Sequence, residues 1–413
     1  MKMLAMLMLL VGLGPQQAPG EDRLYARVTT AAGDEFEGYL RWGANEGSWA
    51  DMLNFNKEIP WENLREAERL DEAYGRRRDQ ERSIRFLGLR ISWDLDDDEV
   101  SEVSSGIRFG HLRALQVVDA LRARLFLKSG EEVELGGGSS DVGRSLRALT
   151  VDDPVRGEVV LRWRDLERVD FMEAPPGASP AAERIHGTLR TQDGVEFTGF
   201  VAWDNDEIFT SDVLDGEEEG TDREVPFHLI SAIEQDGRRG AVVILKSAEE
   251  FRLTGSNDVN DDNRGIAISD PALGMLVVDW DDFDAITFHS PSGEVGGSYG
   301  SFDGGQRLHG SVATRDGREI EGDIRWDNDE SFTWEILDGR SEGVDFDIEF
   351  GRIDRIDKLH GSGVEVMLRD GRIFEVEGSN DVDDDNKGIF VTQADGSTVL
   401  VRWEDFDSVV FAN

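Results

Sequence analysis

The chain has 413 residues, carries a formal net charge of −43 at pH 7 and contains no cysteine. This acidity argues against a nucleic-acid partner, because phosphate backbones require a basic protein surface. The lack of cysteine excludes disulfides and lipid attachment through an N-terminal cysteine. A bound metal ion could therefore stabilise the fold in addition to the hydrophobic core, where disulfides cannot.

The start of the chain has the plan of a secretory signal. Lys2 precedes an apolar run at residues 3–13, and small residues stand just before Glu21. This order predicts a signal peptide over residues 1–20, cleaved before Glu21. No later stretch reaches the roughly 18 apolar residues that a membrane-spanning helix needs. We therefore expect an exported protein, periplasmic or extracellular, with no transmembrane segment.

The rest of the chain is repetitive. Residues 184–288 align with residues 307–411 without a gap, and a diverged copy fills residues 21–172. Pro/Ala-rich and Gly/Ser-rich segments separate the copies, and such segments are typical of linkers. Three domains are expected, which we call the first unit (21–172), the second unit (184–289) and the third unit (307–413). The expected linkers are residues 173–183 and 290–306.

Each unit contains two copies of a shorter pattern. Six segments have an aliphatic residue, then Phe or Trp two positions later, then two further apolar positions at steps of three. This change from two-residue to three-residue spacing and back predicts a strand, a single 3₁₀ turn and a second strand. The segments are residues 107–115, 161–169, 225–233, 278–286, 348–356 and 401–409.

Hairpin signals such as Asp-Gly precede most of these segments, so each half of a unit is expected to contain four or five short strands. This order is similar to that of an SH3-like or Sm-like small β-barrel, a likeness of fold that carries no function. The sequence therefore predicts an all-β protein of three tandem repeats, each with two barrel halves. A six-bladed β-propeller is the alternative, and the linkers between the units argue against it.

The first unit carries an insertion at about residues 58–104. Pro60 and apolar residues at helical spacing predict a helix near its start. The run Arg76–Arg78 on this helix is either a solvated face or a docking point for an anionic partner. Residues 111–127 also have helical propensity, but their alignment with the third unit predicts a strand, a turn and a strand.

Two acidic loops recur in the second and third units. DNDE stands at residues 204–207 and 327–330, and SNDVNDDN or SNDVDDDN at residues 256–263 and 379–386. Calcium prefers such oxygen ligands, although these loops lack the glycine and the twelfth-position glutamate of an EF-hand. The first unit lacks both motifs together, which predicts that the two loops meet at one shared site. The candidate ligands are Asp204, Asp206, Glu207, Asp258, Asn260, Asp262, Asp327, Asp329, Glu330, Asp381, Asp383 and Asp385.

Structural interpretations stand beside these functional ones. Asp and Asn also build solvated Asx turns without any ion. His186 and His309 recur without a second histidine at metal-ligand spacing, so we expect them to be structural. Tryptophans that recur in step with the units are predicted to be core residues, not sugar-stacking platforms. They are Trp42, Trp163, Trp203, Trp280, Trp326 and Trp403.

No catalytic signature stands out in the sequence. It has no cysteine nucleophile, no GxSxG motif and no HExxH motif. We therefore expect a binding or scaffold protein, with calcium as the candidate ion and a cell-surface glycan or protein as the candidate partner. The alternative is a secreted hydrolase that acts on a surface glycan through acidic residues. A cleft between units lined by carboxylates outside the turn loops would favour the hydrolase.

Overall fold

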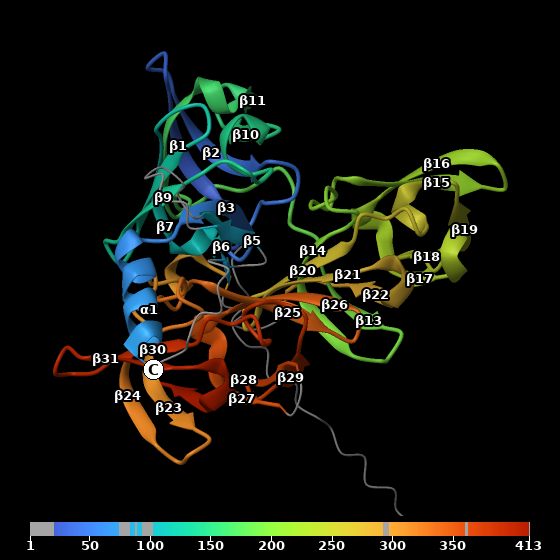
Figure 1. The fold of residues 1–413 in the computed structure, drawn as a ribbon. Helices are drawn as coiled ribbons and strands as arrows, with labels where there is room; N and C mark the ends of the chain where they lie inside the picture. The colour runs from blue at the N-terminus through green and yellow to red at the C-terminus, as the bar shows by residue number, and fades with distance from the viewer. Residues whose placement is uncertain are drawn as a thin grey trace, which may run out of the picture.

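The computed structural model describes residues 20–73, 83–86, 89–92, 102–291, 297–359 and 362–412. The signal-peptide prediction (apart from Gly20) and the Arg76–Arg78 run lie outside these residues. The described residues form an all-β protein with three large antiparallel sheets, two separate hairpins and one α-helix (Figure 1). None of these sheets closes into a barrel, so the closed small barrels expected from the sequence are not observed. Among the described helices, none has the length and apolar character to cross a membrane.

Eight strands of the first unit form one open sheet, in the order β11-β10-β2-β1-β12-β7-β8-β9. Residues 111–127 form β7 and β8 here, which confirms the strand-turn-strand prediction. Buried and half-buried residues alternate along β8, as in a strand with one face in the core. The strands are β1 (Tyr25–Thr30), β2 (Glu35–Trp42), β7 (Leu112–Val117), β8 (Ala123–Leu127), β9 (Glu132–Leu135), β10 (Leu149–Asp153), β11 (Gly157–Leu161) and β12 (Leu166–Phe171).

The second sheet combines strands of two units, in the order β16-β15-β19-β18-β17-β22-β13-β14-β20-β21-β26-β25. Its last two strands, β26 (Val344–Glu349) and β25 (Ile336–Ser341), belong to the third unit, and β26 pairs with β21 along its length. One hydrophobic core runs through both units. The other strands are β13 (His186–Thr191), β14 (Glu196–Ala202), β15 (Val213–Glu218), β16 (Thr221–Pro226), β17 (Ile230–Gln235), β18 (Gly240–Leu245), β19 (Glu250–Thr254), β20 (Ile266–Asp270), β21 (Gly274–Val278) and β22 (Phe283–Phe288).

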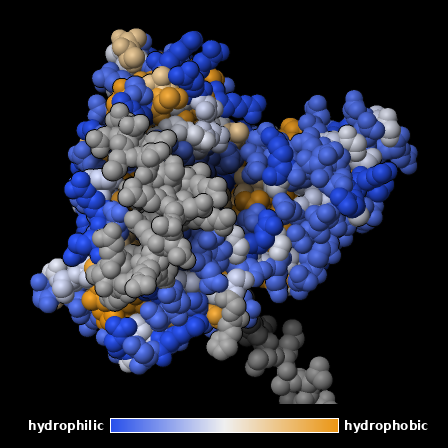
Figure 2. Space-filling view, in the orientation of Figure 1, coloured by the Kyte–Doolittle hydropathy of each residue, from blue (hydrophilic) through white to orange (hydrophobic). Residues whose placement is uncertain are grey.

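The third sheet holds the remaining strands of the third unit, in the order β29-β28-β27-β32-β23-β24-β30-β31. Its strands are β23 (His309–Thr314), β24 (Glu319–Arg325), β27 (Ile353–Lys358), β28 (Val364–Leu368), β29 (Ile373–Val376), β30 (Ile389–Thr392), β31 (Thr398–Val401) and β32 (Phe406–Phe411). Figure 2 shows that the described surface is mostly hydrophilic on one face, as the net charge of −43 requires.

All six predicted segments of strand, 3₁₀ turn and strand are confirmed. The first residue of each turn is a buried Phe or Trp, which anchors the turn in the core. The turns are η1 (Phe109–His111), η3 (Trp163–Asp165), η4 (Phe227–Leu229), η7 (Trp280–Asp282), η9 (Phe350–Arg352) and η10 (Trp403–Asp405).

The recurring tryptophans are core residues, as predicted. Trp42, Trp203 and Trp326 are 0% exposed. Each of their indole N–H groups donates to a backbone carbonyl of the long loop in the same unit. The three tryptophans in the 3₁₀ turns are 2–4% exposed. Such buried rings pack the core and offer no face to a sugar.

The insertion of the first unit lies between two paired strands that a short turn connects in the other units. Hairpins β15–β16 and β25–β26 turn through Glu219-Gly220 and Glu342-Gly343, all with positive φ, as a tight hairpin turn requires. In the first unit β3 (Met52–Glu58) and β6 (Glu102–Arg108) pair in the same way, and the insertion lies between them.

The inserted residues contain the predicted helix and a further hairpin. The helix α1 (Trp61–Ala73) is followed by β4 (Ser83–Phe86) and β5 (Leu89–Ser92). Leu70 of α1 packs with Phe390 of the third sheet, and Glu66 accepts a 2.9 Å hydrogen bond from Arg325. The insertion therefore joins the first unit to the third, as Figure 1 shows for α1.

One carboxylate in each unit also links it to another unit. One of its oxygens accepts hydrogen bonds from backbone N–H groups of its own turn, and the other faces a cation of a different unit. The pairs are Asp51 with Arg184 at 2.9 Å, Asp212 with Arg41 at 3.3 Å and Glu335 with Lys57 at 2.5 Å.

Residues 297–306, expected to be part of a linker, are anchored on the first unit. The Tyr299 ring lies 4.5 Å from the Trp49 ring, and its hydroxyl donates to the carbonyl of Leu112 at 2.9 Å. Phe302 is 4% exposed and packs with the hydrophobic core of the first unit. The composition of this segment is that of a linker, but its aromatic residues hold it in place.

Candidate cation-binding site

The two acidic loops of the second unit meet, as predicted. The DNDE segment is the tip of a hairpin, where Asp204 and Asn205 have φ values of 48° and 61°. Asp and Asn tolerate this left-handed conformation better than most residues. Asn257 of the long loop donates to the Asp204 carboxylate, and the Trp203 indole donates to the carbonyl of Asp258 at 2.8 Å.

The third unit repeats this arrangement. Asp327 and Asn328 take the left-handed positions, with φ values of 41° and 81°. Asn380 donates to the Asp327 carboxylate at 2.8 Å, and the Trp326 indole donates to the carbonyl of Asp381 at 2.9 Å. Two loops that are about fifty residues apart in sequence are therefore locked together in both units.

One aspartate of the long loop has a structural role in all three units. Asp258 accepts a hydrogen bond from the N–H of Asp215 at 2.7 Å, and Asp381 accepts one from the N–H of Asp338 at 3.1 Å. Asp141 does the same in the first unit, where it accepts from Asn54 at 2.8 Å. This role does not depend on the acidic loops, because the first unit lacks them.

The remaining loop candidates form local turns. Asn260 accepts a 2.8 Å hydrogen bond from the N–H of Asp262, and Asp383 accepts one of the same length from Asp385. Asp262 and Asp385 are exposed. These contacts are Asx turns, the second interpretation that the sequence left open.

Three acids of the second unit are positioned to hold a metal ion. Asp204, Asp206 and Glu207 place one oxygen each within 4.8 Å of one another. Their charge is partly balanced, because Nη2 of Arg264 lies 2.6 Å from Asp204 and 2.5 Å from Asp206. Burial, with nearby Asp258, raises the pKa of Glu207 to about 9.

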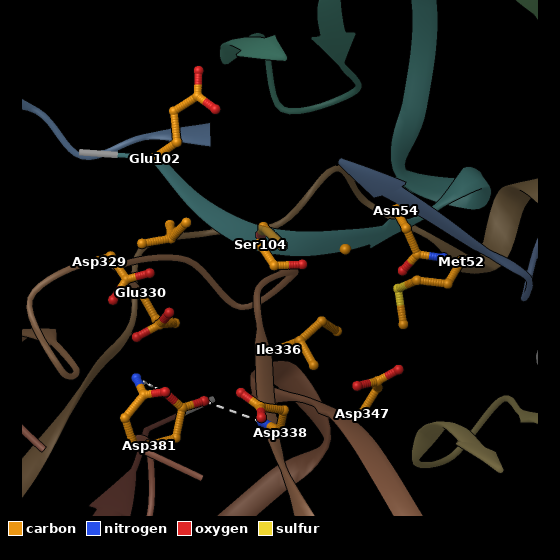
Figure 3. Close-up of a pocket in the computed structure, with 14 residues that line it drawn as sticks. Met52, Asn54, Glu102, Ser104, Asp329, Glu330, Ile336, Asp338, Asp347 and Asp381 are labelled. Atoms are coloured by element: carbon orange, nitrogen blue, oxygen red, sulfur yellow. Dashed lines mark hydrogen bonds between the residues drawn. The ribbon is translucent and has the colours of Figure 1, made fainter. Parts of the chain in front are cut away.

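The third unit places its acids in a cavity of about 400 Å³ that faces the first unit (Figure 3). Strands β3 and β6 form one wall. Asp329, Glu330 and Asp381 gather on the other wall with Asp338, and Asp347 lies apart on β26. Asp329 and Glu330 are 9% and 7% exposed. Each has one buried carboxylate oxygen without a hydrogen-bond partner, Oδ1 and Oε2 respectively.

Burial dominates the electrostatics of this cavity. It raises the pKa of Asp329, and it raises the pKa values of Glu330 and Asp381 well above their usual range. The nearby cation is Lys57 of β3, whose Nζ donates to the carbonyl of Asp329 at 2.8 Å and to Glu335 at 2.5 Å. These raised pKa values favour the protonated, uncharged acids unless a further cation joins the single lysine.

Comparison with known proteins finds no matching family model, curated protein or solved structure. The functional argument therefore rests on the geometry of these loops and on the differences between the three units.

Sequence reasoning missed several residues of this region. Lys57 comes from the first unit, so no motif in the third unit points to it. Asp338 and Asp347 lie on strands outside the two acidic loops, so the loop motifs do not point to them. It also missed a contact of His186, whose ring lies 5.0 Å from that of His289 because β13 pairs with β22. His186 is buried against Phe200, in keeping with a structural role.

Proposed function

We propose that this is an exported binding or scaffold protein, built from three copies of one β-repeat, whose acidic loops bind calcium. The observation that carries this proposal is the gathering of three acidic side chains at the DNDE turn of the second unit, together with the burial of the equivalent acids in the third unit. In the second unit three carboxylate oxygens lie within 4.8 Å of one another. In the third unit the equivalent acids are buried, and Asp329 and Glu330 each retain one oxygen without a hydrogen-bond partner.

The ligand chemistry supports a hard cation. The gathered groups are carboxylates and amides, which suit calcium better than zinc or copper. Calcium also accepts six to eight oxygens in irregular geometry, whereas magnesium demands a near-ideal octahedron. Exported calcium modules bind with dissociation constants near 10⁻⁴–10⁻³ M, so millimolar calcium is the relevant range.

Thermal unfolding of the full chain tests this proposal. A hundredfold excess of calcium over its dissociation constant stabilises the folded state by about 2.7 kcal/mol. The melting temperature should therefore rise when calcium replaces a chelator. High sodium chloride in both samples removes the general screening of a chain with a charge of −43. An unchanged melting temperature contradicts calcium binding.

A hydrolase acting on a surface glycan is the second candidate, and one observation favours it. The cavity between the first and third units is lined by carboxyl groups on strands, Asp338 and Asp347, as well as by those of the turn. Burial raises the pKa of Asp347 to about 7, a suitable value for a general acid near neutral pH.

This candidate is tested by release of reducing ends from soluble polysaccharides. Asp347→Asn should abolish turnover if Asp347 is the acid, while the melting temperature stays close to that of the parent. Wild-type protein that binds a polysaccharide without cleaving it supports the binding module instead.

A further inference from the structure

The turn acids of the second and third units differ in how far they are covered. Asp206 and Glu207 are half-buried, whereas their counterparts Asp329 and Glu330 are buried. Strands β3 and β6 of the first unit make the difference, because they form the wall of the cavity opposite the third-unit acids (Figure 3). We call this pair of strands the roof. The roof removes water from carboxyl groups of which one oxygen each, Oδ1 of Asp329 and Oε2 of Glu330, has no hydrogen-bond partner.

The two units also differ in the cations they supply. In the second unit Arg264 contacts two of the acids, and Arg147 of the first unit lies 3.7 Å from Asp206. In the third unit Lys387 replaces Arg264, and its Nζ donates to the carbonyl of Asp385. The Nζ of Lys57 donates to the backbone carbonyl of Asp329 at 2.8 Å, but it lies 3.8 Å from the Asp329 carboxylate.

Several buried polar atoms at the third-unit turn have no hydrogen-bond partner. They are Oδ1 of Asp329, Oε2 of Glu330, and both Oδ1 and Nδ2 of Asn328. Native proteins rarely leave such atoms unsatisfied, and an ion or ordered water is the usual explanation. Two carboxyl oxygens on the same side of the cavity as Asp338 and Asp381 point to a cation, because water does not supply the positive charge that offsets several covered carboxylates.

We propose that calcium binds in this cavity, held by Asp329, Glu330 and Asp381, and that it ties the roof to the third unit. This inference rests on the proposed calcium-binding function, and it assigns one calcium ion to the cavity between the first and third units. Covering these acids is unfavourable until their charge is neutralised, so ion binding and closure of the roof are coupled. Without the ion, the roof opens and the acids regain water. Lys57 then keeps its bond to Glu335, and Arg108 of β6 keeps its buried 2.6 Å ion pair with Glu349 of the third unit.

The coupling predicts that calcium protects the underside of the roof. Met52 lines the cavity and is 2% exposed. The chain has no cysteine, so Met52→Cys in the full-length protein places a single thiol there. Labelling of this thiol requires the open state. At a hundredfold excess of calcium over its dissociation constant, the labelling rate should fall about a hundredfold.

Matched variants assign the effect to one site. Added to Met52→Cys, Glu330→Gln should remove the calcium dependence, and Glu207→Gln at the equivalent position of the second unit should preserve it. Val155→Cys, at a site 89% exposed, reports any calcium effect on the labelling reagent itself. Near-UV circular dichroism checks that each variant is folded, and Asp329→Asn replaces Glu330→Gln if that variant is not.

The outcomes separate this inference from the function on which it rests. Calcium that raises the melting temperature but leaves the Met52→Cys labelling rate unchanged refutes the bridge and retains calcium binding elsewhere. Loss of the labelling effect in Glu207→Gln instead of Glu330→Gln also refutes it. Calcium that changes neither quantity refutes both proposals.

Discussion

Removing the buried lysine that joins the first and third units should destabilise the protein strongly. The Lys57 and Glu335 side chains are 9% and 4% exposed and lie 2.5 Å apart. Lys57→Met keeps the aliphatic stem but leaves Glu335 as a buried, unpaired charge. Loss of one partner of a buried pair typically costs about 3–5 kcal/mol.

The second unit offers a matched control for this change. Arg41 and Asp212 occupy the equivalent link, but they are 3.3 Å apart and their side chains are 26% and 18% exposed. Solvent screens this pair, and Arg41 also donates to the carbonyl of Ala44 at 2.8 Å. Arg41→Met should therefore cost only about 1–2 kcal/mol.

Urea unfolding of both variants at pH 7 and fixed calcium measures the two free-energy changes. Lys57→Met should shift the midpoint at least twice as far as Arg41→Met. The double variant with Glu335→Gln should recover part of the lost stability, because no charge is then left unpaired. Equal shifts, or no recovery in the double variant, would refute the view that Lys57 compensates a desolvated acid.

Three further predictions follow from the core, the titrating acids and the insertion. Trp326→Ala should lower the free energy of unfolding by about 3–5 kcal/mol in urea titrations, because the ring is 0% exposed, and a near-neutral effect would contradict its place in the core. In chelator the protein should lose stability between about pH 5 and pH 8. Burial raises the pKa of Glu207 to about 9 and that of Asp258 to about 6, so the folded state holds protons that the unfolded chain has released. Calorimetry across this range checks the sign, and a melting temperature that rises toward pH 8 in chelator would oppose it. Replacing residues 59–101 by Glu-Gly should keep the far-ultraviolet circular dichroism signal of the β-strands. Binding of a hydrophobic dye should increase, because α1 no longer covers Phe390. Loss of the β-strand signal would show that the first sheet needs the insertion.

Much of the local structure followed from residue spacing. The switch from two-residue to three-residue steps located six of the ten 3₁₀ turns among the described residues, because a turn anchored by one buried aromatic leaves the same local signal wherever it occurs. The alignment of 111–127 with the third unit outweighed its helical propensity, since pairing with neighbouring strands decides such short segments. Joint variation of the two acidic loops likewise indicated that they meet, which the bonds to Asp204 and Asp327 confirm.

The sequence by itself thus determined the β-strand pattern, the turns, the tryptophan core and the loops that touch within one unit, because these depend on residues close in sequence or related by repetition. Only the tertiary structure decided how units join. The pairing of β21 with β26 uses backbone groups that any strand edge presents, so no side-chain pattern predicts it. The burial of the cavity acids also depends on contacts between units. Asp329 and Glu330 are buried, unlike Asp206 and Glu207, because strands of the first unit cover them. Burial and the partner cation set the properties of a carboxylate, and both are supplied here by residues far away along the chain.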